Sequence, residues 1–262
     1  MLSKRNLKFI QSLRFKKQRD IHRQFIIEGD KVVKDLLHSD WEIPYLFATP
    51  DWLSQLPAGD KKKPGQIAEL SDREFKKIST LKTPNKVLAV VMQPQYSLNW
   101  EEIASDLTLF LEEIQDPGNA GTILRIAAWF GIKNVCCSRS TADIYNPKVV
   151  QATMGALLFV KVHYVESVPF LRECSERGIP VYGTYIHGKN IYEASLAQNG
   201  LIVLGNESRG ISGDCYPFVK EKISIPGFGS YERGMESLNV AAAGAIVCSE
   251  FRRRNPLDKL RL

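Results

Sequence analysis

The sequence predicts an α/β protein of two units, a small one over residues 1–94 and a larger one over residues 106–262 with a largely parallel sheet. The length of 262 residues suits two domains of ordinary size. Short apolar runs alternate with helical patterns along the chain, which is the order that α/β sheets require. The stretch 93–100 lacks this periodicity and contains a proline, so we expect a linker over residues 95–105.

The elements of the N-terminal unit follow in order. Residues 4–18 carry a basic helical pattern, residues 25–27 form a short apolar strand, and residues 30–37 continue as a helix. Apolar runs over residues 43–48 and 87–92 predict two further strands. These elements are typical of a small α/β domain.

Six apolar runs, each followed by a helical segment, organise the rest of the chain. This alternation predicts a doubly wound sheet of mostly parallel strands. Ligands of such sheets bind beyond the carboxyl ends of the strands, so functional residues are expected in the loops after the runs. The runs are residues 107–114, 134–137, 159–165, 180–186, 201–205 and 222–226.

Composition excludes several classes of protein. With 44% apolar and 24% charged residues, the chain resembles packed globular proteins and not disordered or fibrous ones. The longest uncharged apolar stretch, residues 237–249, is too short to span a membrane, and the charged N-terminus does not match a signal peptide, so we expect a cytoplasmic protein. The five cysteines include no C-x-x-C pair and the four histidines show no ligand spacing, so we predict neither disulfides nor a metal site.

Positive charge is concentrated near the N-terminus. Residues 1–96 contain 18 Lys and Arg against 11 Asp and Glu, whereas residues 97–262 contain 17 against 18. This distribution predicts binding to a polyanion, and the alternative is a solvated basic helix face. The candidate contacts to nucleic acid are Arg14, Lys16, Lys17 and Arg19.

Two glycine-rich segments are similar to nucleotide-binding loops, but each lacks an essential part. Residues 183–189 fit G-x-x-x-x-G-K, yet Asn190 stands where a phosphate-binding loop has the Ser or Thr that holds magnesium. Gly227, Gly229 and Gly234 do not have the spacing of the dinucleotide-binding fingerprint. A nucleoside triphosphatase is therefore only a third hypothesis for the function.

Three loops after apolar runs contain residue types suited to chemistry. After the first run, Asn119 is a candidate helix N-cap and Arg125 is expected in the second turn of the helix. Glu207 lies in the loop after the fifth run, an unusual place for a residue that only packs. In the last loop Ser237 is expected to cap the final helix, whose small residues over 241–245 permit another helix to approach closely.

These loops resemble the three motifs of the SpoU (TrmH-type) RNA 2′-O-ribose methyltransferases of the SPOUT class. The resemblance covers about residues 107–250, and the motifs have the order and spacing of that family. One such motif alone is a weak signal, whereas three together are a specific one. The matching segments are residues 119–125, 204–210 and 225–239.

The resemblance implies an α/β sheet whose C-terminal strands thread through a loop to form a deep trefoil knot. Residues 4–19 and 25–29 look like the start of the family's small ribosomal-protein-like substrate-binding domain. The chain departs from the family at Ser208, where a glycine is usual, and in the longer loop 227–234. Both departures concern the shape of the pocket.

The resemblance further implies methyl transfer from S-adenosylmethionine to a ribose 2′-hydroxyl, without a metal and in a homodimer formed by the C-terminal domain. Ribosomal RNA is favoured over transfer RNA as the substrate. The adenosine part of the cofactor would lie among Thr184, Gly205, Ile225 and Leu238. A non-catalytic RNA-binding or ribosome-assembly protein with the same fold is the alternative, and the intact motif residues argue against it.

Arg125 is the principal catalytic candidate that the resemblance implies. It would act either on the proton of the ribose hydroxyl or as an electrostatic clamp. Because a guanidinium has a pKa above about 12, the second role is physically easier. The residues expected to orient Arg125, the ribose and the cofactor are Asn119, Glu207, Ser237 and Asn239.

Overall fold

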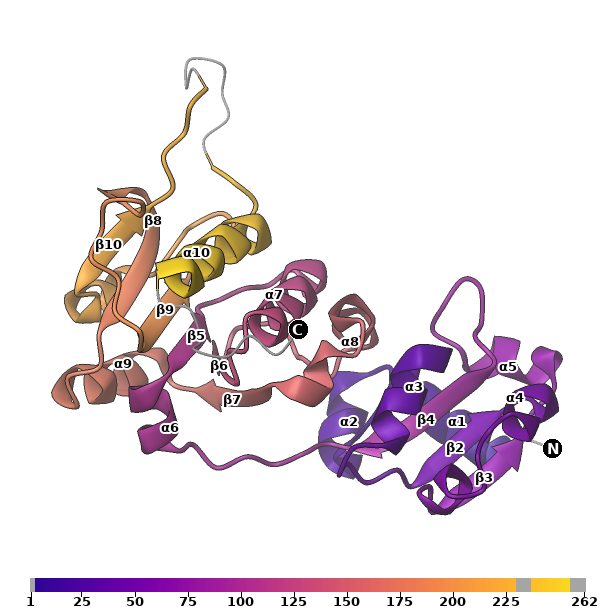
Figure 1. Ribbon diagram of the computed structural model, residues 1–262. Coiled ribbons are helices and arrows are strands. Elements are labelled where there is room, and N and C mark those ends of the chain that lie inside the picture. The colour runs from indigo at the N-terminus through magenta and orange to yellow at the C-terminus, as the bar shows by residue number, and fades with distance from the viewer. Residues whose placement is uncertain (1–2, 230–236, 255–262) are drawn as a thin grey trace. The chain divides into compact units, whose positions relative to one another are not determined.

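The computed structural model describes residues 3–229 and 237–254, and within them the chain divides into two α/β units. The N-terminal unit comprises the residues up to 95 together with residues 143–158, and the C-terminal unit comprises residues 96–142 and those from 159 onward (Figure 1). The predicted α/β class is confirmed. The membership of residues 143–158 in the N-terminal unit had no signal in the sequence.

A mixed four-stranded sheet forms the N-terminal unit, in the order β1-β4-β2-β3. β4 is antiparallel to both β1 and β2, and β3 is parallel to β2. β3 was not predicted from the sequence, because its residues are mostly exposed and form no apolar run. The elements are α1 (Lys4–Ser12), α2 (Lys16–His22), β1 (Gln24–Glu28), α3 (Asp30–Leu37), β2 (Tyr45–Ala48), α4 (Pro50–Ser54), η1 (Asp60–Lys62), β3 (Gln66–Glu69), α5 (Asp72–Ile78), β4 (Val87–Met92) and α8 (Pro147–Thr153).

The basic N-terminal segment is two helices and not the single helix predicted over residues 4–18. Helix α1 ends at Ser12, and Phe15 is extended before α2 begins at Lys16. The carbonyl oxygens of Leu13 and Arg14 lie in this break and accept hydrogen bonds from Nη1 of Arg19 at 2.9 and 2.8 Å. Burial of Ile10 and Leu13 in the core of the unit fixes the position of the break.

Arg19 is a structural residue of the N-terminal unit and not an accessible contact for nucleic acid, so its predicted role is corrected. Only 2% of Arg19 is exposed. Its Nη2 and Nε lie 2.5 and 3.1 Å from Oδ2 of Asp143, which belongs to the segment that joins this unit from later in the chain. Four of the five N–H donors of the guanidinium are engaged with protein atoms, and the side chain is buried, so it is not accessible to a phosphate.

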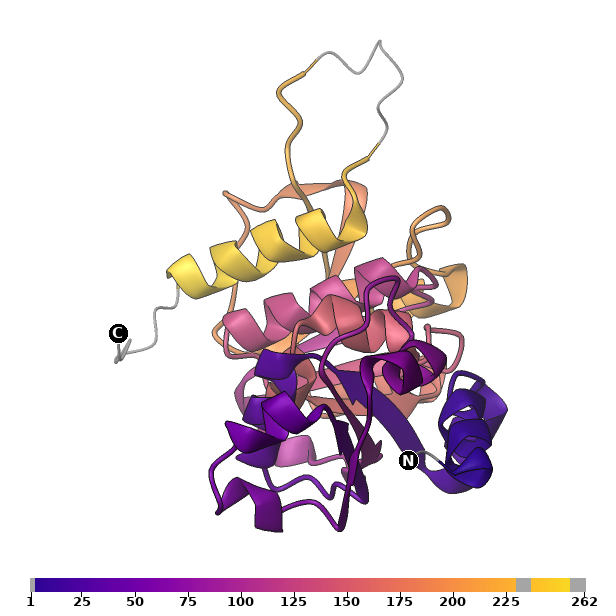
Figure 2. The same cartoon turned by 90° about the vertical axis from the view of Figure 1, so that its right-hand side faces the viewer.

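Six parallel strands form the sheet of the C-terminal unit, in the order β10-β8-β9-β5-β6-β7, as the alternation of runs predicted. Helices α7 and α10 lie side by side (Figures 1 and 2). The elements are α6 (Trp100–Ser105), β5 (Leu107–Leu111), α7 (Pro117–Trp129), β6 (Asn134–Ser138), η2 (Ala156–Phe159, at the junction of the units), β7 (Lys161–Val165), α9 (Ser167–Glu176), β8 (Val181–Asn190), β9 (Gly200–Leu204), η3 (Gly213–Phe218), β10 (Glu221–Ser224) and α10 (Val240–Arg254).

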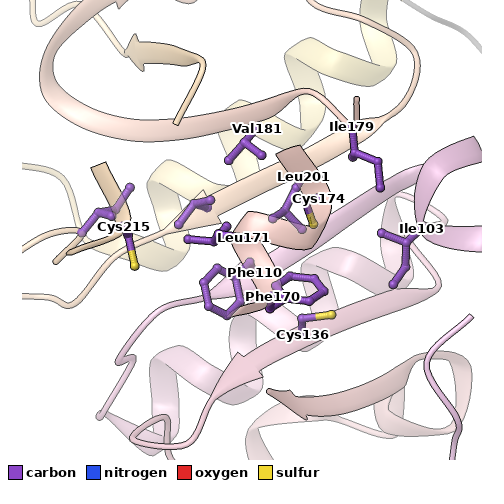
Figure 3. Close-up of a cluster of buried hydrophobic side chains, with 12 residues drawn as sticks. Ile103, Phe110, Cys136, Phe170, Leu171, Cys174, Ile179, Val181, Leu201 and Cys215 are labelled. Carbon is purple, nitrogen blue, oxygen red and sulfur yellow. The ribbon is translucent and has the colours of Figure 1, made fainter. Parts of the chain in front are cut away.

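A cluster of buried apolar side chains packs α6 and α9 against this sheet (Figure 3). Phe170 and Cys174 of α9 contact the strands, and Ile103 of α6 joins them, although α6 falls within the segment expected to be a linker. All five cysteines are buried free thiols. Burial raises the pKa of the Cys174 and Cys248 thiols to about 12, so these two thiols are inert at neutral pH.

Two helix caps differ from the prediction. Asp116, and not Asn119, is the N-cap of α7, because the helix begins at Pro117 and Oδ1 of Asp116 accepts the backbone N–H of Asn119 at 2.8 Å. Asn239, and not Ser237, provides the side-chain cap at the start of α10. Proline at the first helical position is well suited to a helix start, which explains the earlier beginning of α7.

The small residues of α10 permit close packing, as predicted from the sequence. A Cβ atom at Gly244 would lie 3.1 Å from a methyl of Leu204 in β9. Ala241 and Gly244 are buried, whereas Ala242 is exposed. None of the helices within the described ranges has the length and apolar character needed to cross a bilayer.

Candidate functional site

A pocket of about 630 Å³ lies where the carboxyl ends of β9 and β10 and the outer part of β8 meet the start of α10. This volume falls within the range of about 300–1,000 Å³ that is typical of small-molecule sites. The position agrees with the expectation for a parallel sheet. Seven residues selected from the sequence line the pocket: Thr184, Gly205, Glu207, Ile225, Ser237, Leu238 and Asn239.

The wall formed by the end of β9 has no room for a side chain at Gly205. A Cβ atom there would lie 2.4 Å from both the carbonyl carbon of Gly210 and the nitrogen of Ile211. Thr184 on the neighbouring strand donates its hydroxyl to the carbonyl of Val203 at 2.9 Å, so its methyl group and not its polar atom is free. The wall is therefore built from backbone and small groups.

Asn206, which sequence analysis did not single out, shapes the loop after β9. Its Oδ1 accepts the N–H groups of Ser208 and Arg209 at 3.0 and 3.1 Å, and its Nδ2 donates to the carbonyl of Glu113 at 2.8 Å. An Asn followed by a polar turn was the available signal, since Asn side chains make this kind of local turn. Ser208 itself is exposed, is not among the lining residues and has no left-handed φ, so its replacement of a usual glycine strains nothing.

A chain of hydrogen bonds joins the three motif loops. Asn119 donates from Nδ2 to Oε1 of Glu207 at 3.1 Å and accepts at Oδ1 from Nδ2 of Asn239 at 2.9 Å. Oδ1 of Asn239 then accepts the N–H groups of Ala241 and Ala242 at the start of α10. Only a side chain that both donates and accepts can occupy the middle of this chain, which explains an amide at position 119.

Glu207 also holds the first motif loop directly. Its carboxylate accepts the backbone N–H groups of Gln115 and Asp116 at 3.3 and 3.1 Å. Burial alone raises the pKa of Glu207, but the hydrogen bonds from Asn119 and from these backbone groups outweigh it, so the pKa lies below its usual range. Glu207 is therefore an ionised anchor at neutral pH and a poor proton acceptor.

Tyr185 is a further lining residue that sequence analysis missed. Burial, and next the neighbouring Tyr216, raise the pKa of the Tyr185 hydroxyl to about 12. Nζ of Lys222 lies 5.3 Å from the centre of its ring and 5.0 Å from that of Tyr216. Tyr185 lies in an apolar run, where an aromatic residue is expected to pack in the core. Its sequence context therefore gave no indication that it lines a pocket.

Arg125 does not line the pocket. It lies in the third turn of α7, one turn beyond the predicted place because the helix starts earlier, and its side chain is exposed. One turn further along the same face, Trp129 is 84% exposed. The structure therefore brings together the other predicted catalytic and cofactor residues but leaves Arg125 on an open helix face.

The predicted nucleic-acid contacts are in different environments. Arg14 is exposed, but its Nη2 donates to the carbonyls of Ile78 and Ser79 at 3.3 and 2.7 Å. Lys16 is exposed and pairs with Asp20 at 2.8 Å, and Lys17 is exposed. Elsewhere in the described ranges, no group of three or more His, Cys, Asp or Glu side chains has the geometry to hold a metal ion.

Two family descriptions match the sequence. The SpoU rRNA Methylase family matches residues 106–249, which include the whole pocket. The MRM3-like substrate binding domain matches residues 4–89. The first match covers more than half of the chain, and the second covers most of the N-terminal unit.

Individual relatives extend over nearly the whole chain. The 23S rRNA (guanosine(2553)-2′-O)-methyltransferase RlmP of Bacillus subtilis is 27% identical over 92% of this chain and 94% of its own length. A solved structure from Porphyromonas gingivalis, assigned to the TrmH family of RNA methyltransferases, has a TM-score of 0.86 and 40% identity over 97% of this chain and 99% of its own. The AdoMet-bound rRNA methyltransferase of Sinorhizobium meliloti has a TM-score of 0.85 and 27% identity over 97% of each chain.

Proposed function

The chain belongs to the SpoU rRNA methylase family, and we propose on that basis that it methylates a ribose 2′-hydroxyl of ribosomal RNA with S-adenosylmethionine as the methyl donor. It is an S-adenosylmethionine-dependent RNA 2′-O-methyltransferase of the SPOUT type. The observation that carries the proposal is the hydrogen-bonded chain Glu207–Asn119–Asn239, which joins the three family motifs around one pocket. A non-catalytic RNA-binding protein is therefore not favoured.

The pocket fits the cofactor. Gly205 lies in its wall, where the backbone of Gly210 and Ile211 approaches too closely for a Cβ atom. Ile225 and Leu238 supply apolar contacts in the pocket. When bound, S-adenosylmethionine supplies an electrophilic methyl group on a sulfonium centre. Thr184, Gly205, Ile225 and Leu238 are the residues that would hold it.

The chain's own contribution to the reaction is mainly positioning. Holding the ribose hydroxyl in line with the methyl group is the larger part of such a transfer. We assign Asn119, Glu207, Ser237 and Asn239 to keeping the motif loops in register. Arg125 stabilises the developing alkoxide charge or clamps the adjacent phosphate, because its guanidinium is a poor proton acceptor. None of these roles requires a metal ion.

Ribosomal RNA is the proposed substrate for two reasons. The relative from Bacillus subtilis acts on 23S rRNA, and so by its name does the uridine-specific 2′-O-methyltransferase of Streptomyces viridochromogenes, which is 30% identical over 72% of this chain and 68% of its own length. The basic N-terminal unit matches a substrate-binding domain. A cytoplasmic location is part of the proposal, because the relative from Bacillus subtilis, which matches nearly the whole chain, is bacterial.

The test of this function combines binding with mapping of the product. We expect calorimetry to detect binding of S-adenosylmethionine, and Leu238→Arg to abolish it by filling the pocket. We expect total RNA from cells with the gene to contain a 2′-O-methyl group in ribosomal RNA that is absent without the gene. Wild-type protein that binds no cofactor would contradict the proposal, and a modification found only in transfer RNA would change the substrate.

We also propose that the working form is a homodimer built on α7 and α10. Trp129 is largely exposed near the end of α7, and Ala242 is exposed near the start of the adjacent helix α10. Arg125 stands on the same open face of α7, outside the pocket of its own chain. A second copy of the chain packed on this face would exclude water from Trp129. It would also place residues of the second copy close to Arg125.

Sedimentation tests the dimer. We expect the wild type to sediment as a dimer at micromolar concentration, and Ala242→Trp to give monomers with loss of activity, because the larger side chain would separate the packed helices. The spectrum of the variant by circular dichroism would show whether it is folded. A wild-type monomer that methylates RNA at that concentration would contradict the requirement for a dimer.

A further inference from the structure

The connection between α5 and β4 in the N-terminal unit is an ordered loop without helix or strand, residues 79–86 (Figure 1). Such a loop normally depends on tertiary contacts for its conformation, since it has no ladder of its own hydrogen bonds. Its apolar content is small, and Leu81 is only half-buried. Hydrogen bonds from neighbouring elements therefore fix it.

Glu28, the last residue of β1, holds the loop at both ends. Its Oε1 accepts the hydroxyl of Ser79 at 2.5 Å and the N–H of Asn85 at 3.4 Å. Its Oε2 accepts the N–H and the hydroxyl of Thr80 at 3.1 and 3.3 Å. One carboxylate therefore receives four donors from three residues of the same loop, which is close to the number that its two oxygens can accept.

The base of the loop is fixed from a second side. The backbone carbonyl groups at the end of α5 have no hydrogen-bond partner within the helix. Nη2 of Arg14 donates hydrogen bonds to the carbonyl groups of Ile78 and Ser79. Nε2 of Gln11 donates a hydrogen bond to the carbonyl of Lys77 at 2.9 Å. A cation at the carboxyl end of a helix is also favoured by the helix dipole. Arg14 therefore stabilises the base of the loop, and its guanidinium is not simply a free contact for RNA.

The loop and the end of α5 present concentrated positive charge. Residues 75–86 contain four lysines and no acidic residue. All four side chains are exposed. Lys76 and Lys77 lie in the last turn of α5, and Lys82 and Lys86 lie in the loop itself. A fixed loop loses little conformational freedom when it binds, so its charges contribute more to affinity than those of a mobile segment.

We propose that the loop 79–86 is a phosphate-binding element for the RNA substrate, that Lys82 and Lys86 contact phosphates, and that Glu28 is the positioning residue of this element. This inference rests on the proposed function, since it assumes an RNA substrate. It moves the main RNA contact of the N-terminal unit away from Arg14 and Arg19, whose guanidinium groups are engaged with protein atoms. Lys16 and Lys17 on α2 remain exposed and can add to the contact.

The first experiment compares two pairs of exposed lysines in the full chain. We expect Lys82→Ala with Lys86→Ala to weaken binding of an rRNA fragment roughly tenfold and to flatten the salt dependence of affinity by about 1.5 units, at about 0.7 to 0.9 per lost phosphate contact. Lys61→Ala with Lys62→Ala removes the same charge from η1 and is the matched control. An equal loss in both pairs would show a general charge effect and overturn the proposal.

The second experiment tests Glu28 through the lysines. Glu28→Gln replaces one carboxylate oxygen with an amide NH₂ group, which cannot accept the hydrogen bonds that the loop donates. The loop should lose its fixed position, so we expect RNA affinity to fall about threefold or more. In the background that lacks Lys82 and Lys86, the same substitution should change RNA affinity by less than about twofold, because the loop then has no charge to position. A purely structural role for Glu28 would lower Tm and leave RNA affinity unchanged, which would overturn its role as positioning residue.

Failure of this inference differs from failure of the proposed function. If the wild type binds the rRNA fragment and S-adenosylmethionine but the loop variants bind RNA equally well, only the loop assignment is wrong. If the wild type binds no rRNA, the proposed substrate is wrong. Cofactor affinity by calorimetry should be the same in all these variants, because the substituted residues belong to the N-terminal unit and the pocket to the C-terminal unit.

Discussion

Replacing Arg125 with alanine is expected to lower the rate of methyl transfer by about 100- to 1,000-fold, the usual cost of removing one group that stabilises transition-state charge. The affinity for S-adenosylmethionine should stay within a few-fold of the wild type, because Arg125 does not line the pocket. Stability should also be nearly unchanged, since the side chain is exposed on α7. Single-turnover kinetics with saturating cofactor would measure the rate.

Arg125→Lys separates the two roles considered for this residue. Lysine keeps the positive charge but lacks the planar fork that binds a phosphate or alkoxide through two hydrogen bonds. A clamp should therefore retain part of its effect with lysine, more at low ionic strength, whereas a proton acceptor should show a changed pH profile because lysine titrates near pH 10. Substantial activity in Arg125→Ala would move the role to another residue.

Replacing Gly205 with alanine should abolish cofactor binding. The new Cβ atom would lie 2.4 Å from two backbone atoms of the facing loop, at Gly210 and Ile211, and backbone cannot rotate away as a flexible side chain can. The loop must shift, which we expect to cost about 3 kcal/mol of stability or more and to weaken cofactor binding at least roughly 100-fold. Thermal unfolding and calorimetry would measure the two effects.

Gly213→Ala is the matched control for this substitution. No atom lies within 4 Å of a Cβ placed at Gly213, and its φ lies outside the left-handed region. Both Tm and cofactor affinity should therefore be nearly those of the wild type. If Gly205→Ala binds the cofactor normally while Gly213→Ala does too, the close approach at Gly205 does not form the wall of the site.

The local patterns of the sequence were sufficient for most of the sheet. β5 falls within a predicted run, and β6 and β9 each extend one residue beyond theirs, because buried parallel strands are continuous apolar segments with clear ends. β3 was missed, since an exposed edge strand has no such pattern. The caps of α7 and α10 were each assigned to a neighbouring residue, because Asp116, Asn119, Ser237 and Asn239 all have side chains suited to capping.

The sequence by itself determined the α/β class and the positions of the motif loops, and its resemblance to the family selected seven of the residues that line the pocket. The class and the loops depend on local periodicity and on residue type, which the chain carries at each position. Only the tertiary structure decided what the polar side chains contact. It placed Arg19 against Asp143, Arg14 on the end of α5, and Glu207 on Asn119, partners 124, 64 to 65 and 88 residues away in the chain. A charged or amide side chain has the same pattern in the sequence whether it faces water or a distant partner, so its role depends on the folded contacts.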